Sequence, residues 1–212
     1  MKKQKSKEDK KISDSTWVFI IAFLICVVMF FIGVFILNQM KPKVITENSN
    51  GFVFVKKGNF WVTDVKNPVI NQVYSLEFRY PPSQVKNITI EGNPSSFFKL
   101  LELNNLTATY LTFNPNDNLT FMNLAAADIS KLLNFLHGVT TVASCTVNET
   151  SACQDRPIVT CKSEEGNAMV IYLRSSNEPK VIMNKNCLTI EGSGTDMLRA
   201  HTRLLFSWYG II

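Results

Sequence analysis

The strongest hydrophobic pattern is an uninterrupted apolar run near the start of the chain. Residues 17–37 are apolar except for Gly33, and no charged residue lies between Ser15 and Met40. At about 1.5 Å per residue, a helix of this length spans about 31 Å and matches a bilayer core of about 30 Å. A buried core helix would carry a polar stripe, so the run predicts a transmembrane helix over residues 17–38.

Shorter hydrophobic patterns after this run predict strands. The turn Lys57-Gly58-Asn59 between two apolar runs predicts a hairpin, and Ser83 to Val85 is expected to be a turn. Further strands are predicted over residues 73–79, 87–90, 106–113, 158–161, 169–173, 180–183 and 187–190.

Three segments have the three- and four-residue spacing of helices. One runs from about Thr120 to Leu136 and ends at Gly138; a short one follows Pro94, with Asn93 as its N-cap; and the last runs from Ser193 to Gly210. Ser193 and Asp196 fit a capping box. The apolar face of the last helix consists of Met197, Ala200, Leu204, Leu205 and Trp208. Arg199, Arg203 and His201 fall outside this face, so we expect the arginines in water and His201 to be solvated or at a boundary.

These elements divide the chain into four parts. Residues 1–16 form a basic cytoplasmic tail, 17–38 a transmembrane helix, 39–50 a polar stalk without hydrophobic period, and 51–212 a single folded domain. Strands and helices alternate in part, which predicts an α/β or α+β domain with a mixed sheet and about three helices.

Lysines beside the apolar run predict its orientation. The tail carries Lys2, Lys3, Lys5, Lys7, Lys10 and Lys11, whereas only Lys41 and Lys43 follow the run closely. By the positive-inside rule the N-terminus is cytoplasmic and the C-terminal domain is extracellular, on a cell membrane. A cleaved signal peptide is the alternative, but its apolar region is shorter and a small-x-small site should follow. Asn38-Gln39-Met40 follows instead, which favours an uncleaved signal-anchor.

The net charge of +5 does not indicate nucleic acid. The tail has six lysines against three acidic residues, and the remaining chain has 16 basic against 14 acidic residues, without clusters. The expected partners are therefore the lipid bilayer and a membrane or cell-surface protein, and no nucleic acid.

Cysteines and sequons agree with translocation of the domain. Four cysteines outside the membrane run predict two disulfides, for which three connectivities exist. We expect Cys145–Cys153, because the short separation can close a local hairpin, and Cys161–Cys187. Their spacing is too wide for a zinc knuckle. Four sequons make Asn87, Asn105, Asn118 and Asn148 glycosylation candidates.

The sequence contains no recognised catalytic pattern. His137, at a helix C-terminus, and His201 are the only histidines, and neither has a second metal ligand at typical spacing. A Gly-x-Ser-x-Gly elbow does not occur. We therefore assign no catalytic, cofactor-binding or metal-binding residue and expect no cofactor.

One group of motifs resembles a known set of proteins. The motifs are Asn50-Gly51-Phe52-x-Phe54, Phe78-Arg79-Tyr80-Pro81-Pro82, Arg156-Pro157-Ile158-Val159-x-Cys161 and Trp208-Tyr209-Gly210-Ile211. Together they resemble uncharacterised membrane-anchored extracellular proteins of small-genome, symbiotic-type archaea. The resemblance implies location and kinship but no activity.

Two function classes follow. The first is a non-enzymatic binding protein or envelope-complex subunit, which the lack of a catalytic pattern favours. The alternative is an anchored extracellular enzyme acting on glycans or peptides. A cleft with convergent carboxylates or an exposed histidine would favour the enzyme, and a flat exposed apolar patch would favour the binding protein.

Overall fold

The computed structural model describes residues 14–39, 44–66, 71–162 and 168–212, which form two units divided after Val44. The first unit contains helix α1 (Asp14–Gln39), and most of the expected tail lies outside the described residues. Within α1, Trp17–Ile36 has a mean hydropathy of 3.3, and its side chains are almost all exposed. The helix is therefore long and apolar enough to cross a membrane, a property that a signal sequence shares.

The second unit begins with a four-stranded antiparallel sheet in the order β1-β2-β3-β4. Its strands are β1 (Thr46–Ser49), β2 (Phe52–Lys57), β3 (Phe60–Lys66) and β4 (Val73–Phe78). The predicted hairpin between β2 and β3 is confirmed, because Lys57 lies opposite Phe60. β1 lies within the range expected to be a stalk. The folded unit therefore begins at Ile45, because β1 pairs with β2 along its whole length.

A second, six-stranded mixed sheet has the order β5-β9-β10-β8-β6-β7. Its strands are β5 (Thr89–Glu91), β6 (Ala108–Phe113), β7 (Thr140–Cys145), β8 (Met169–Arg174), β9 (Lys180–Asn184) and β10 (Cys187–Glu191). Only the β9–β10 pair is antiparallel. The unit is thus α+β with a mixed sheet, as predicted.

The described part of the second unit has four α-helices, one more than expected. They are α2 (Pro82–Val85), α3 (Ser96–Leu103), α4 (Leu119–His137) and α5 (Thr195–Trp208), with a short 3-10 helix, η1 (Ser151–Cys153). The additional helix is α2, where a turn was expected. Gly138 ends α4 in the left-handed conformation with a φ of 65°, as its sequence predicts.

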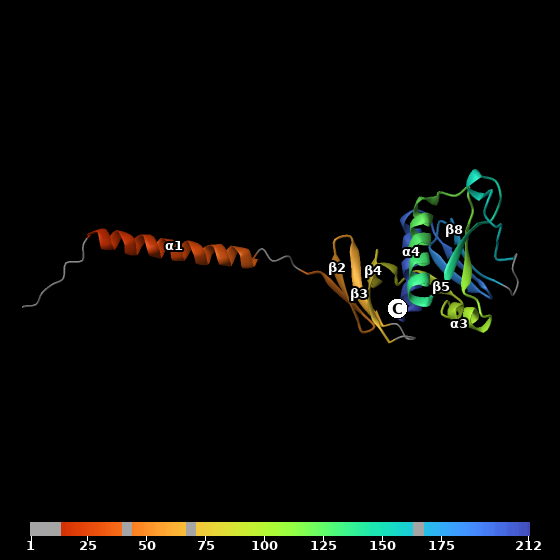
Figure 1. Cartoon of the computed structure of the whole chain (residues 1–212), viewed down its shortest axis with the longest axis horizontal. Helices are drawn as coiled ribbons and strands as arrows, with labels where there is room; N and C mark the ends of the chain where they lie inside the picture. Colours follow the sequence, from red (N-terminus) through yellow and green to blue (C-terminus); the bar gives the residue numbers. More distant parts are fainter. Residues whose placement is uncertain (1–13, 40–43, 67–70, 163–167) are drawn as a thin grey trace, which may run out of the picture. The chain divides into compact units, whose positions relative to one another are not determined.

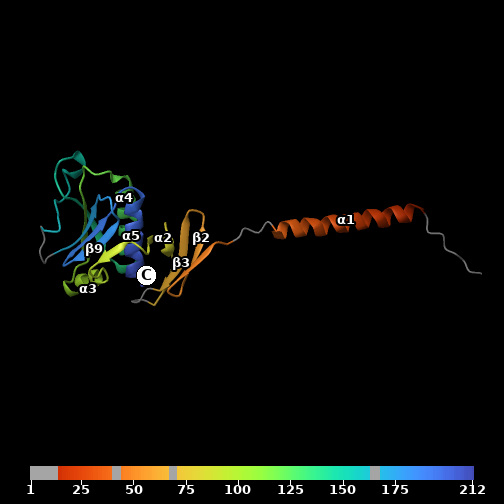
Figure 2. The same cartoon turned by 180° about the vertical axis from the view of Figure 1, so that it is seen from behind.

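Helices α4 and α5 lie between the two sheets in both views (Figures 1 and 2). On one side, the ring of Phe206 on α5 packs 5.4 Å from that of Phe54 and 4.8 Å from that of Phe78, centroid to centroid. On the other side, α5 contacts β9 and β10. Because both sides are covered, α5 has more buried residues than its single apolar face predicts.

Both predicted disulfides are present. The Cα atoms of Cys145 and Cys153 are 6.0 Å apart, and those of Cys161 and Cys187 are 5.4 Å apart. The second disulfide fixes the segment before Cys161 over the sheet face opposite the helices. A small apolar cluster forms there, consisting of Val159, Val170, Cys187, Tyr110, Cys161 and Tyr172.

Three local predictions were wrong. Residues 158–161 do not form a strand, because only Ile158 makes an isolated bridge, to Cys145. β7 was missed: it is an edge strand with a largely exposed, irregular burial pattern. The expected capping box of the last helix does not form, because Gly194 occupies the N-cap position and Asp196 pairs with Arg199 at 3.3 Å.

Arg203 was also expected to lie in water and does not. It is half-buried, its Nη1 donates to the Ile212 carbonyl at 2.9 Å, and its Nε has no partner among the described atoms. The apolar face of α5 is otherwise as predicted, with Trp208 half-buried and its Nε1 donating to the Pro94 carbonyl at 3.1 Å.

The central position of α5 gives the first testable prediction. Replacing Phe206 with Ala should reduce the free energy of unfolding by about 3–5 kcal/mol, because it leaves a cavity between the sheets. Replacing Leu103, which is 66% exposed, with Ala should change it by less than about 0.5 kcal/mol. Urea denaturation followed by circular dichroism measures both. Equal midpoints for Phe206→Ala and the parent would show that α5 is not central to the core.

Candidate functional site

A cavity of about 500 Å³ lies between β4, α4 and α5, and we call it the β4–α4 cleft. One wall consists of the five consecutive residues 75–79, and Phe60 lies beside it. The opposite wall consists of Asp128, Lys131, Leu132 and Phe135 of α4. The floor is formed by His201, Thr202 and Leu205 of α5, all of which are buried.

Strand β4 borders the cleft with its outer edge. Leu76 and Phe78 point into the core, whereas Ser75 and Glu77 are exposed, as the alternation of the sequence predicts. Side chains of a strand alternate between faces, so five consecutive lining residues mean that the strand's edge borders the cleft. β4 ends the four-stranded sheet, and no described residue makes a backbone hydrogen bond to this outer edge.

Helix α4 presents one stripe to the core and another to the cleft. The cleft residues 128, 131, 132 and 135 recur at three- and four-residue steps, which places them on one face. A neighbouring stripe that includes Ile129 and Leu133 is fully buried. At the start of the helix, the Asn118 side chain accepts a hydrogen bond from the Thr120 amide at 3.2 Å, which fixes the N-terminus.

Two pairs of side chains connect residues 74–79 with α4 beside the cleft. Nε of Arg79 lies 2.9 Å from Oδ2 of Asp128, and the Arg79 guanidinium lies 5.7 Å from the centre of the Phe60 ring. In the second pair, the rings of Tyr74 and Phe135 are 5.1 Å apart. Glu77 and Lys131 add one charge of each sign. The lining therefore has balanced charge and mostly apolar walls, a composition typical of ligand sites.

His201 is the unusual residue of the cleft. It is only 2% exposed, and neither ring nitrogen has a hydrogen-bond partner among the described residues. Burial lowers its pKa from 6.5 to about 4, although the nearby Asp128 carboxylate and the Leu198 carbonyl favour the protonated ring. The expectation of a solvated or boundary histidine was therefore wrong, because the four-stranded sheet and α4 cover that side of α5.

His137 is the last residue of α4, as predicted, but most of its ring is covered. It stacks on Phe98 with ring centres 4.0 Å apart, and its Nε2 is buried without a partner among the described atoms. Burial lowers its pKa. Among the described residues, no group of three or more His, Cys, Asp or Glu could hold a metal ion.

The sequence did not identify Arg79 and Asp128 as a pair. They are 49 residues apart: Arg79 directly follows β4, and Asp128 lies on α4. Their only sequence signal is that Arg79 ends an alternating strand and that Asp128 lies beside, and not within, the apolar stripe of a helix.

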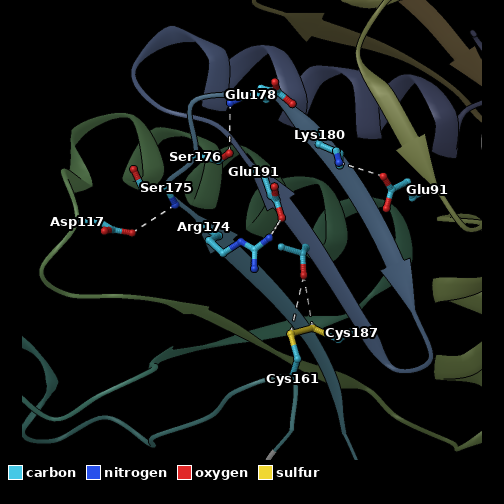
Figure 3. A network of polar contacts seen from close by, with 11 residues as sticks. Glu91, Asp117, Cys161, Arg174, Ser175, Ser176, Glu178, Lys180, Cys187 and Glu191 are labelled. Carbon is cyan, nitrogen blue, oxygen red and sulfur yellow. Dashed lines mark hydrogen bonds and ion pairs between the residues drawn. A yellow bond between two sulfur atoms is a disulfide. The ribbon is translucent and has the colours of Figure 1, made fainter.

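A second polar region lies on the open face of the six-stranded sheet (Figure 3). Arg174 pairs there with the buried Glu191, and Nζ of Lys180 lies 3.0 Å from Oε1 of Glu91. Among the described residues, these charges already pair with one another. We therefore do not choose this region as the functional site.

A second cavity, of about 540 Å³, is lined by residues that include Thr63, Lys66, Trp208 and Tyr209. None of its described residues has a buried side-chain nitrogen or oxygen without a partner. The β4–α4 cleft is the stronger candidate for this reason.

The four glycosylation candidates Asn87, Asn105, Asn118 and Asn148 are all exposed. Asn118 also caps α4 through its side-chain oxygen. All four positions are thus accessible in the folded unit.

Comparison with protein-family models, curated proteins and solved structures finds no match.

The buried His201 predicts a pH dependence of stability. The unfolded chain gains a proton on this ring below about pH 6.5, whereas the folded chain does so only near pH 4, so stability should fall between these values. The loss should reach roughly 3 kcal/mol, at about 1.4 kcal/mol per pH unit. Urea denaturation of the parent and of His201→Gln from pH 7 to pH 4 measures it.

The glutamine variant keeps a polar side chain that does not titrate, so it should lose this part of the pH dependence. His137→Gln removes only the contribution of the His137 ring and should keep the part that comes from His201. If His201→Gln and the parent lost stability equally with falling pH, His201 would not be buried as a neutral ring.

Proposed function

We propose that the chain is a single-pass membrane-anchored cell-surface protein that acts as a non-enzymatic binding protein or envelope-complex subunit. The observation that carries this proposal is the combination of an apolar helix, Trp17–Ile36, with a second unit held by two disulfides. Disulfides persist in oxidising compartments, so they support a unit on the outer side of the membrane.

The lysine asymmetry supports an uncleaved signal-anchor with a cytoplasmic N-terminus. Six lysines precede the helix, and only two follow it closely. The partners in this proposal are the bilayer and a membrane or cell-surface protein. The sequence motifs that resemble small-genome archaeal proteins are compatible with this location, and the exposed sequons are compatible with a glycoprotein.

The binding role rests on the β4–α4 cleft, which has the size and apolar lining of a ligand site. Glu77 and Asp128 bring two carboxylates to this cleft, a feature that would also suit the alternative, an anchored enzyme. Asp128, however, is engaged by Arg79, and the buried His201 has a lowered pKa that makes it a weak base at neutral pH. These features support binding more than catalysis.

The orientation can be tested with the sequons as reporters. Translation of the full chain into endoplasmic-reticulum microsomes should give a product whose electrophoretic mobility is decreased by glycans, because all four sequons follow the apolar helix. A glycosidase should reverse the decrease, and replacing the four asparagines with Gln should abolish it. The product should also resist alkaline extraction and keep an N-terminal epitope tag, as an uncleaved anchor requires.

A variant with the six tail lysines replaced by Gln tests whether the lysine asymmetry determines the orientation of the helix. It should show a smaller glycosylated fraction, because the positive-inside signal is removed. An unglycosylated, membrane-embedded parent would reject the proposed orientation, and loss of the N-terminal tag would identify a cleaved signal peptide.

A further inference from the structure

The β4–α4 cleft has the architecture of a site for an extended chain. One wall is the open edge of a strand, and the other is a single face of a helix. Residues 75–79 span roughly 14 Å at the rise of a strand, and residues 128–135 span roughly 10 Å at the rise of a helix. A cleft of this length accommodates three or four extended residues.

Two sets of polar groups in the cleft lack partners. The first is the outer backbone edge of β4, to which no described residue makes a backbone hydrogen bond. The second is the imidazole of His201 in the floor, whose two nitrogens are buried and unpaired within the described part of the chain. A neutral imidazole has one donor and one acceptor. An occupant that satisfies both sets needs regularly spaced backbone groups and a small polar side chain.

We infer that the β4–α4 cleft binds an extended peptide segment of a partner protein, which adds to the open edge of β4 as a further strand. This inference rests on the proposed function as a binding protein and specifies its ligand. Backbone hydrogen bonds to a sheet edge provide affinity, and pockets for alternate side chains provide specificity.

The lining defines the chemistry of this peptide. Alternate side chains point toward the floor, where Leu205, together with Leu76 and Phe78 of the adjoining wall, favours apolar groups. One of the inward positions meets His201 and suits a hydroxyl or amide side chain. Charges at the rim are balanced, with Glu77 and Asp128 against Arg79 and Lys131, so a peptide without strong net charge fits best.

The test uses the full chain in lipid nanodiscs and a phage-displayed library of random heptapeptides. Enriched sequences are synthesised with acetylated and amidated ends and with N-methyl groups on either the odd or the even backbone nitrogens. Amides of a strand point alternately to its two sides, so one methylation pattern should abolish binding and the other should retain it. Hydrogen exchange of the bound parent should show new protection of β4 amides.

Two variants of α4 provide a matched pair. Leu132→Trp places a large side chain in the cleft and should weaken binding by about tenfold or more. Leu124→Trp, on the same helix but outside the cleft, should change the affinity by less than about twofold. Thermal melts show whether both variants fold. The hydrogen-exchange measurement uses the parent chain, so its result does not depend on the folding of either variant.

Four results would overturn the inference. They are the absence of enriched peptides, equal binding of both N-methylated forms, protection of amides away from β4, and pairing of β4 between two copies of the chain. If the glycosylation test succeeds and this test fails, the anchored location stands and only the peptide site is rejected. A reversed topology would instead reject the location without changing the result for the cleft.

Discussion

The burial of α5 between two sheets is the contact on which the rest of the second unit depends. Phe206 contacts Phe54 and Phe78 of the small sheet, while Met197 and Leu204 of the same helix belong to the fully buried core. A helix covered on two opposite sides replaces two separate cores with a single one. Without α5, Phe54 and Phe78 of the four-stranded sheet would lose their contacts with Phe206.

This central position explains contacts that are far apart in the sequence. Immediately after α5, Ile211 is fully buried, and its carbonyl accepts a hydrogen bond from Oγ of Ser49 at 3.0 Å. The Gly210 carbonyl similarly accepts one from the Asn50 side chain. The end of β1 and the residue after it are therefore joined to residues that follow α5, which is why residues 45–50 of the expected stalk are part of the fold. The Cys161–Cys187 disulfide acts elsewhere, on the face of the larger sheet opposite the helices.

An element could be predicted when the signal for it lies within its own stretch of sequence. The apolar helix α1, α4 and the β2–β3 hairpin were predicted because an apolar run, a helical period ended by Gly138, and a two-residue turn are local signals. The disulfide pairing was also correct, since a short separation favours local closure. β1 and β7 lack a regular apolar alternation, because edge strands have fewer buried neighbours. The cleft could not be predicted, because Arg79, Asp128 and His201 come from three elements that only the tertiary fold brings together.

His201 shows how a central structural helix and a candidate binding site share one residue. Each buried polar atom without a partner costs roughly 1–3 kcal/mol, and a typical domain has a total stability of only about 5–15 kcal/mol. Two unpaired ring nitrogens are thus a substantial cost in the helix that holds the core together. A leucine at this position would avoid the cost and continue the apolar character of Leu198 and Leu205. Buried polar groups of this kind call for a specific explanation, and the cleft provides one, since His201 lies in its floor beside the open edge of β4. The stability lost in the unoccupied state would be regained when an occupant pairs with the ring, so binding to the cleft would also stabilise α5 and, through it, both sheets.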